Sequence, residues 1–259
     1  MRILFIGDVV GSSGREMVTS RLAGIVADHR IDLAIANGEN AASGFGITPR
    51  LADELFSAGV EVISGGNHSW DRKEIFDYMP HEPRLLRPAN FPAGAPGHGL
   101  YLDTTKQGVG YAVLNLQGRV FMPALDCPFR TADRELARVP STVKVILVDM
   151  HAEATSEKQA MGWYLDGRVS VVLGTHTHVA TADERVLPNG TAYITDVGMT
   201  GPHESVIGMD RNAMVKRFLD ALPARFEVAS GDVRLNAIIA DVDETTGHAQ
   251  SIERLRLPK

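Results

Sequence analysis

Five short, strongly apolar runs, each ending in polar side chains, most constrain what this chain can fold into. The clearest, residues 169–173, is rich in β-branched residues and predicts a fully buried strand. Residues 174–178 follow at once and contain two histidines. In α/β sheets, binding sites lie at the carboxyl ends of the parallel strands. The other runs are residues 3–6 before Asp8, 33–36 before Glu39 and Asn40, 60–63 before Asn67 and His68, and 143–148 before His151.

The two histidines, His176 and His178, stand two positions apart. An extended continuation of the strand would aim both rings to one side, as two ligands of neighbouring metal ions would require. Taken alone, the pair could equally be two ordinary loop histidines. The convergence of carboxylate, carboxamide and imidazole groups at five strand ends favours the metal interpretation.

The polar groups at these strand ends offer hard oxygen and borderline nitrogen donors and no sulfur. They are Asp8, Glu39, Asn40, Asn67, His151, His176 and His178. Such a set suits Mn, Fe or Zn better than Mg, which prefers nearly all-oxygen ligands. One tetrahedral zinc could not use all of them, whereas two ions sharing a bridging carboxylate could. Paired ions about 3.5 to 4 Å apart recur in phosphoester hydrolysis, where a hydroxide held between them attacks phosphorus.

The order of these blocks resembles the signature of the calcineurin-like metallophosphoesterases. The blocks are Gly7-Asp8, Gly38-Glu39-Asn40, Gly66-Asn67-His68, Met150-His151 and residues 174–178. Two departures narrow the resemblance. Val10 stands where the superfamily has a first-block histidine, and Glu39 stands where it has a bridging aspartate. This variant, together with residues 195–202, is similar to the YmdB-type bacterial phosphodiesterases along essentially the whole chain.

The resemblance implies an α/β fold of the calcineurin-like metallophosphoesterase type, with a two-layer mixed β-sandwich core flanked by helices (αββα). It implies one metallophosphoesterase domain over residues 1–259. It also implies two divalent or mixed-valent transition-metal ions, iron or manganese before zinc. The first ion would take Asp8, Glu39, Asn40 and His178, and the second Glu39, Asn67, His151 and His176, with Glu39 bridging.

By the same resemblance, His68 would act as the general acid that protonates the leaving alkoxide. The chemistry supports this role independently, because an alkoxide leaves poorly unless protonated and imidazole titrates near neutral pH. The alternative is a histidine that only supports the site. Asp71 could orient His68, although a solvated carboxylate at a helix start is the plainer interpretation.

The predicted activity is hydrolysis of small phosphodiesters, with cyclic nucleotides (2′,3′ or 3′,5′) implied by the resemblance. The net charge of −6 argues against the stripe of basic residues that binds long nucleic acid. A small-molecule substrate is therefore expected. Two alternatives stay open: a nucleotide phosphomonoesterase, and a regulatory module that holds metal with little turnover. A dinucleotide-binding domain would need a glycine fingerprint that residues 7–14 do not supply.

Composition and patterning set the remaining expectations. The chain has 259 residues, 44% hydrophobic and 22% charged, as in globular proteins. No apolar run approaches the roughly 20 residues of a spanning helix, so we expect a cytoplasmic protein without membrane contact. Residues 83–98 are a candidate lid or subunit contact, which leaves a homo-oligomer open. Helices are predicted at residues 15–30, 48–59, 69–80 and 210–222, and a hairpin from residues 235–242 and 251–257.

Overall fold

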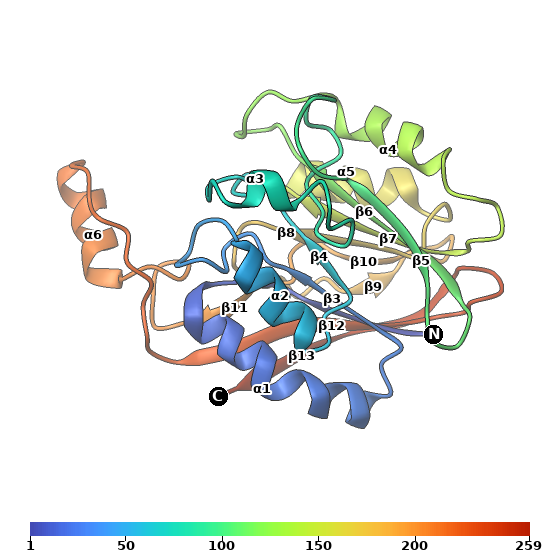
Figure 1. Ribbon diagram of the computed structural model, residues 1–259, viewed down its shortest axis with the longest axis horizontal. Coiled ribbons are helices and arrows are strands. Elements are labelled where there is room, and N and C mark those ends of the chain that lie inside the picture. The colour runs from blue at the N-terminus through green and yellow to red at the C-terminus, as the bar shows by residue number, and fades with distance from the viewer.

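Two mixed β-sheets pack face to face in the computed structural model, which describes residues 1–259 (Figure 1). The first sheet runs in the order β2 (Asp8–Val9), β11 (Met199–Pro202), β12 (Val233–Val242), β1 (Arg2–Ile6), β3 (Leu33–Asn37) and β4 (Val62–Ser64), with β13 (Ala249–Pro258) beside β12. The second runs in the order β5 (Leu100–Thr104), β6 (Gly110–Gln117), β7 (Val145–His151), β8 (Val171–Thr175), β10 (Ala192–Ile194) and β9 (Arg185–Val186).

The functional strands run parallel within each sheet. In the first sheet β1 pairs with β3 and β3 with β4 in parallel, while β12 joins β1 in the antiparallel sense. In the second sheet β6, β7, β8 and β10 run parallel to one another, while β5 and β9 join the two edges in the antiparallel sense. The carboxyl ends of the parallel strands in one sheet therefore lie at one edge of that sheet.

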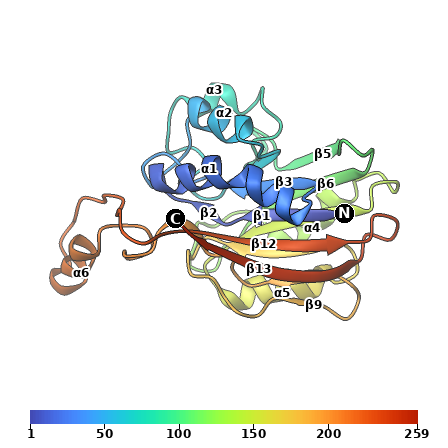
Figure 2. The same ribbon diagram turned by 90° about the horizontal axis from the view of Figure 1, so that it is seen from below.

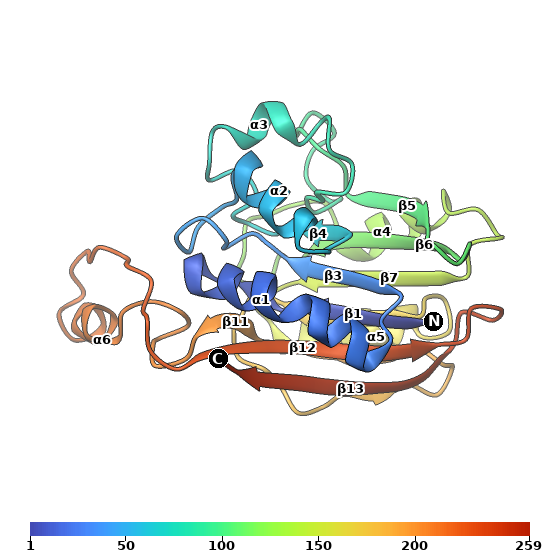
Figure 3. The same ribbon diagram turned by 60° about the horizontal axis from the view of Figure 1, so that its bottom comes forward.

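Helices cover the outer face of each sheet. They are α1 (Gly11–His29), α2 (Pro49–Ser57), α3 (Ile75–Tyr78), α4 (Pro128–Leu136), α5 (Thr155–Leu165) and α6 (Arg211–Asp220). Figure 3 shows α1 lying in front of β1 and β12, and both helices α1 and α2 pack on the first sheet. Helices α4 and α5 pack on the second sheet. The αββα architecture expected from the resemblance is thus confirmed. Helix α6 is the exception, because all views set it apart from the sheets (Figures 1 and 2).

The central strands are apolar on both faces because each face packs against a different core. Successive side chains of a strand point to opposite faces. In β1, Ile3 and Phe5 belong to the core between the two sheets, whereas Leu4 and Ile6 belong to the core beneath α1 and α2. All four side chains are fully buried. A continuous apolar run is therefore the pattern that this layered position requires.

Several predicted elements are confirmed, and two needed correction. Thr48 caps α2 by accepting from the Leu51 amide, Asp210 caps α6, and β12 and β13 form the predicted hairpin. The predicted helix over residues 69–80 is wrong except for α3. Ser69 explains this, because its hydroxyl accepts from the amide of Gly66 and so favours a turn over a helix.

Helix α1 begins at Gly11, four residues before the predicted start, so the glycine-rich segment is partly helical. Gly14 permits this, because a Cβ there would lie 2.4 Å from the carbonyl oxygen of Thr200 in β11. No helix in the structure has both the length and the apolar character needed to cross a membrane.

Candidate metal centre

The predicted donor residues come from strand ends of both sheets. Asp8 follows β1, Glu39 and Asn40 follow β3, and Asn67 follows β4; these belong to the first sheet. His151 ends β7, and His176 and His178 follow β8 in the second sheet. The structure brings them together in two adjoining groups. We call Glu39, Asn67, His151 and His176 the histidine half-site, and Asp8, Asn40 and His178 the aspartate half-site.

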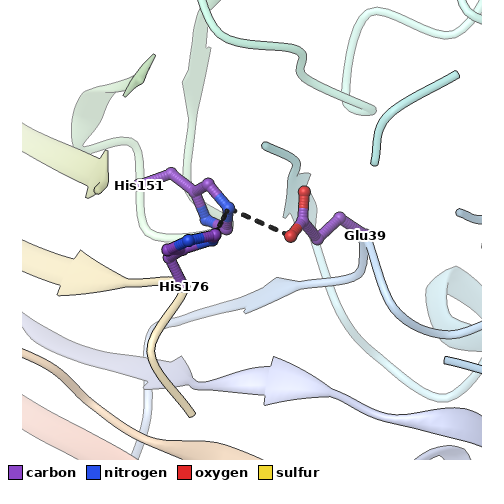
Figure 4. A group of neighbouring side chains, drawn as sticks. All are labelled: Glu39, His151 and His176. Carbon is purple, nitrogen blue, oxygen red and sulfur yellow. Dashed lines mark hydrogen bonds and ion pairs between the residues drawn. The ribbon is translucent and has the colours of Figure 1, made fainter. Parts of the chain in front are cut away.

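The histidine half-site is centred on one ring nitrogen. His151 Nε2 lies 3.0 Å from Glu39 Oε1, 3.0 Å from Asn67 Oδ1 and 3.1 Å from His176 Nδ1. Figure 4 shows Glu39 and both histidines converging, and their ligand atoms lie within 4.8 Å of one another. A ring nitrogen carries at most one proton and cannot satisfy three such neighbours. A cation among these nitrogen and oxygen donors would engage them all, so the residues fit a transition metal.

Polar contacts on the far side of each ring favour one tautomer. The ring of His151 donates from Nδ1 to Thr175 Oγ1 at 2.8 Å, and Thr175 donates to Asp149 Oδ1 at 2.7 Å. His176 Nε2 lies 3.1 Å from the carboxylate of Glu153. Each histidine therefore turns a lone pair toward the cluster, as metal-binding histidines with an anchored second nitrogen do.

The aspartate half-site contains polar atoms without partners. Asp8 Oδ1 and Asn40 Oδ1 are buried and accept no hydrogen bond. His178 donates from Nδ1 to the carbonyl of Ile207 at 2.8 Å, which leaves Nε2 facing Asp8 Oδ1 at 3.9 Å. A buried acceptor without a partner is costly. A cation bound between these two oxygens and the imidazole lone pair would give each of them a partner.

The loop that carries His176 and His178 is not extended, contrary to the sequence expectation. His176 has φ 98° and His178 has φ 65°, both in the left-handed region that L residues rarely adopt. Asp196 holds the loop by accepting from the amide and hydroxyl of Thr177, and it pairs with the buried Lys158 at 2.6 Å. The strained turn, rather than strand alternation, directs one imidazole to each half-site.

Close approach of the two sheets requires a glycine before Asn67. A Cβ on Gly66 would lie 2.3 Å from the His151 ring and 2.4 Å from Glu39 Oε2. Any larger residue would push these two side chains apart. Gly66, in the third sequence block, is therefore required by the close packing at the metal cluster.

Burial and mutual charge shift the pKa values of the cluster in opposite directions. Burial would raise the pKa of Glu39, but His151 lowers it to about 2. Burial would lower the pKa of His151, but Glu39 raises it to about 9. Burial, reinforced by the charge of His151, lowers the pKa of His176 to about 3. Burial raises the pKa of Asp8. Such opposed shifts are typical of functional sites.

His68 lies beside the cluster without joining it. Its backbone amide donates to Glu39 Oε2 at 3.0 Å, and its ring Nδ1 lies 2.7 Å from Asp71 Oδ2. The prediction that Asp71 is merely solvated is therefore incomplete, because this half-exposed carboxylate also orients the ring. His68 lines the same cavity of about 720 Å³ as Glu39, His176 and His178.

Sequence reasoning missed three supporting residues. Asp149 precedes His151 by two positions in β7, so alternation puts both on one face and could have revealed it. Burial raises the pKa of Asp149 to about 6, while Ser64 and Thr175 donate to its carboxylate. Glu153 and Lys158 act through contacts distant in sequence, and no local pattern marks them.

An αββα core with a carboxylate and imidazole cluster at its strand ends defines a metallophosphoesterase-like protein. Within that class the chain belongs to the YmdB-like family, whose model, described as YmdB-like protein, matches residues 4–255. The family expected from the sequence blocks is thereby confirmed.

Relatives match the chain over nearly its whole length. It is 53% identical over 256 residues to a 2′,3′-cyclic-nucleotide 2′-phosphodiesterase of Bacillus subtilis, covering 98% of this chain and 96% of that protein. A crystal structure of a hypothetical protein from Thermus thermophilus superposes with a TM-score of 0.94 at 43% identity, with full coverage of both chains. The structure of a novel phosphatase from Mycoplasma pneumoniae gives a TM-score of 0.94 at 34% identity and covers 100% and 93%.

Proposed function

We propose that this chain is a metal-dependent phosphodiesterase that hydrolyses small phosphodiesters, cyclic nucleotides (2′,3′ or 3′,5′) above all. The observation that carries the proposal is the convergence of Glu39, Asn67 and His176 on one nitrogen of His151. The Bacillus subtilis relative, named for cyclic-nucleotide hydrolysis, supports the substrate class. In this proposal residues 1–259 form one catalytic domain, because both sheets supply donors to the site.

Two groups of residues would hold the metal ions. The histidine half-site would hold one ion and the aspartate half-site the other, with Glu39 shared. Iron or manganese suits these donors best, and zinc is also compatible. Bound there, the ions would supply the Lewis acidity that activates water and polarises the phosphoryl group.

The general acid in this proposal is His68. Water oxygen forms the new bond to phosphorus while the bond from phosphorus to the ester oxygen breaks. The departing oxygen takes the proton of His68 Nε2, and the proton of the attacking water passes to solvent. Asp71 contributes by holding Nδ1 at 2.7 Å, so that Nε2 faces the cavity.

A phosphomonoesterase is the second candidate, favoured by the description of the Mycoplasma pneumoniae structure as a novel phosphatase. The same residues would serve both reactions, because a monoester differs only in the group that remains on phosphorus. A panel containing a 2′,3′-cyclic nucleotide, a 3′,5′-cyclic nucleotide and a nucleoside monophosphate separates the two. Faster turnover of the monophosphate would reject the diesterase.

The first test measures metal content and hydrolysis on the same sample. Bis(p-nitrophenyl) phosphate and a 2′,3′-cyclic nucleotide serve as substrates before chelation, after it, and after reloading with Mn or Fe. We expect about two ions per chain and an activity that disappears and returns with them. Two ions without turnover of any ester would favour the regulatory module. A protein that takes up no metal would reject the site.

The role of His68 is tested by His68→Ala, with His81→Ala as the matched control on an exposed histidine away from the cavity. Losing a general acid costs about 100- to 10,000-fold in turnover. We expect such a loss in His68→Ala with the metal content retained, and none in His81→Ala. Full activity in His68→Ala would remove the proposed acid.

A further inference from the structure

We infer that the apolar wall facing the metal centre is a nucleobase subsite, formed by Phe45, Phe226 and the inner face of α6. This inference rests on the proposed function, because it locates the base of a nucleotide whose phosphate lies at the metal cluster. The cavity of about 720 Å³ has the metal donors and His68 on one side. Its other side is formed by Phe45, Met209, Met214, Phe218 and Phe226.

The rings on this wall form a continuous series that begins at the proposed acid. The Phe45 and His68 ring centroids are 5.1 Å apart at an interplanar angle of 75°. The Phe45 and Phe226 centroids are 5.7 Å apart at 72°. The guanidinium of Arg217 then lies over Phe226, 4.9 Å from its centroid. The wall thus leads outward from the reacting centre, in the order in which a nucleotide places phosphate, ribose and base.

The chemistry of the wall fits a base rather than a further phosphate or sugar. Aromatic faces stack on any nucleobase. Each such stack contributes about 1–3 kcal/mol to the binding free energy of a base, or roughly 5- to 150-fold in Kd. Arg217 adds a planar cation, which both stacks on aromatic rings and donates to ring nitrogen or carbonyl acceptors. A cavity of this size lies within the range of about 300 to 1,000 Å³ that small-ligand sites occupy.

The exposure of α6 points the same way. Phe218 is 83% exposed although it lines the cavity, so its ring is available to a ligand. Phe226 is 41% exposed. Large aromatic side chains left open beside a reaction centre gain burial when a flat ligand lies against them. The body of the fold does not cover α6, which stands apart from both sheets (Figures 1 and 3).

The neighbouring residue Leu219 supplies a matched control. It is also 83% exposed on α6 but does not line the cavity. If the apolar surface of α6 served only to contact another protein, Leu219 and Phe218 would be comparable. If α6 forms a base subsite, only Phe218 faces the ligand.

The experiment compares adenosine 2′,3′-cyclic phosphate with methyl riboside 2′,3′-cyclic phosphate, which has the same ester and no base. We expect the unsubstituted enzyme to prefer the nucleotide in kcat/KM by roughly 10-fold or more, mainly through KM. Phe218→Ala and Phe226→Ala should each reduce this preference by about 10-fold. Phe218→Trp should preserve it, and Leu219→Ala should leave it unchanged.

A binding titration with adenosine, which has no phosphate, keeps the subsite test separate from turnover. The adenosine Kd should rise about 10-fold in Phe218→Ala and stay constant in Leu219→Ala. If neither ester is hydrolysed but adenosine binds in this pattern, the proposed function fails and the subsite stands. If both esters are hydrolysed equally well and Phe218→Ala changes nothing, the enzyme stands and the subsite fails. Equal effects of Phe218→Ala and Leu219→Ala would overturn the subsite in favour of a protein contact.

Discussion

The two half-sites of the candidate metal centre are built differently. In the histidine half-site the ligand atoms contact one another, because His151 Nε2 lies within 3.1 Å of ligand atoms of Glu39, Asn67 and His176. In the aspartate half-site Asp8 Oδ1 and Asn40 Oδ1 are buried without any hydrogen bond. The ligand atoms of the first group are therefore held by contacts with one another, whereas two ligand oxygens of the second group have no protein partner at all.

This difference has a consequence for metal loading. A site held by neighbouring hydrogen bonds loses little conformational freedom on binding, so it binds tightly. Oxygens without partners gain most from a cation, but the three side chains of this group are held separately. Asp8 Oδ2 accepts from the His176 amide, Asn40 Nδ2 donates to the Gly44 carbonyl, and His178 donates to the Ile207 carbonyl. We therefore expect two ions of unequal affinity, with the tighter one in the histidine half-site.

Glu39→Gln should have the largest effect, because in the proposed function both half-sites share this carboxylate. The substitution keeps the shape and removes the charge that faces His151 and His68. We expect kcat/KM for a 2′,3′-cyclic nucleotide to fall by more than about 1,000-fold, with lower metal content. Glu244→Gln, on an exposed loop, is the control and should match the unsubstituted protein. Near-normal activity in Glu39→Gln would reject the proposal that Glu39 bridges the two ions.

His178→Ala changes the aspartate half-site alone. The aspartate half-site loses its nitrogen donor, while the contacts around His151 are untouched. Metal analysis after dialysis should find about one ion per chain, and kcat/KM should fall more than about 100-fold, beyond the loss typical of supporting residues. Loss of both ions together would show that the half-sites are not independent.

Thr175→Val tests whether hydrogen bonding organises the histidine half-site. Valine keeps the shape but breaks the link from His151 Nδ1 through Thr175 to Asp149. Groups that orient a metal-binding histidine are typically worth about 10- to 100-fold in affinity or activity. We expect a loss in that range in a metal titration, with recovery in Thr175→Ser because serine keeps the hydroxyl. Equal losses in both variants would point to packing instead.

The layers, and the residues that gather at the candidate metal centre, were predictable from sequence because they depend on local patterns. Apolar runs such as residues 3–6 reveal a strand buried on both faces, and the polar groups that follow such runs mark strand ends. The order of the sequence blocks then predicted the YmdB-like family. Each of these features is readable within a few neighbouring residues.

The supporting contacts were not predictable, because they join distant parts of the chain. The turn at Ser69, whose hydroxyl accepts from the Gly66 amide, takes the place of the start of the helix predicted over residues 69–80. The left-handed conformations of His176 and His178 depend on Asp196 and Lys158, which periodicity does not connect to them. The arrangement of the donors is therefore a tertiary property, although their identity is local.

Glu153→Gln should have the smallest effect of these substitutions. Glu153 reaches His176 Nε2 at 3.1 Å, as Thr175 reaches His151, but its side chain is half exposed. Solvent screens an exposed charge, and glutamine still offers an oxygen to the imidazole N–H. We expect metal affinity at the histidine half-site to fall by only about 3-fold, less than for Thr175→Val.

Ionic strength separates charge from geometry at this position. If the Glu153 carboxylate acts through its charge, the difference between Glu153→Gln and the unsubstituted protein should shrink as salt is raised, because the Debye length falls to about 3 Å at 1 M. The Thr175→Val loss should not depend on salt, since that hydrogen-bonded chain is buried. A salt-independent loss in Glu153→Gln as large as that of Thr175→Val would mean that the exposed and buried supports of the two histidines are equivalent. The preorganisation of the histidine half-site would then owe nothing to burial.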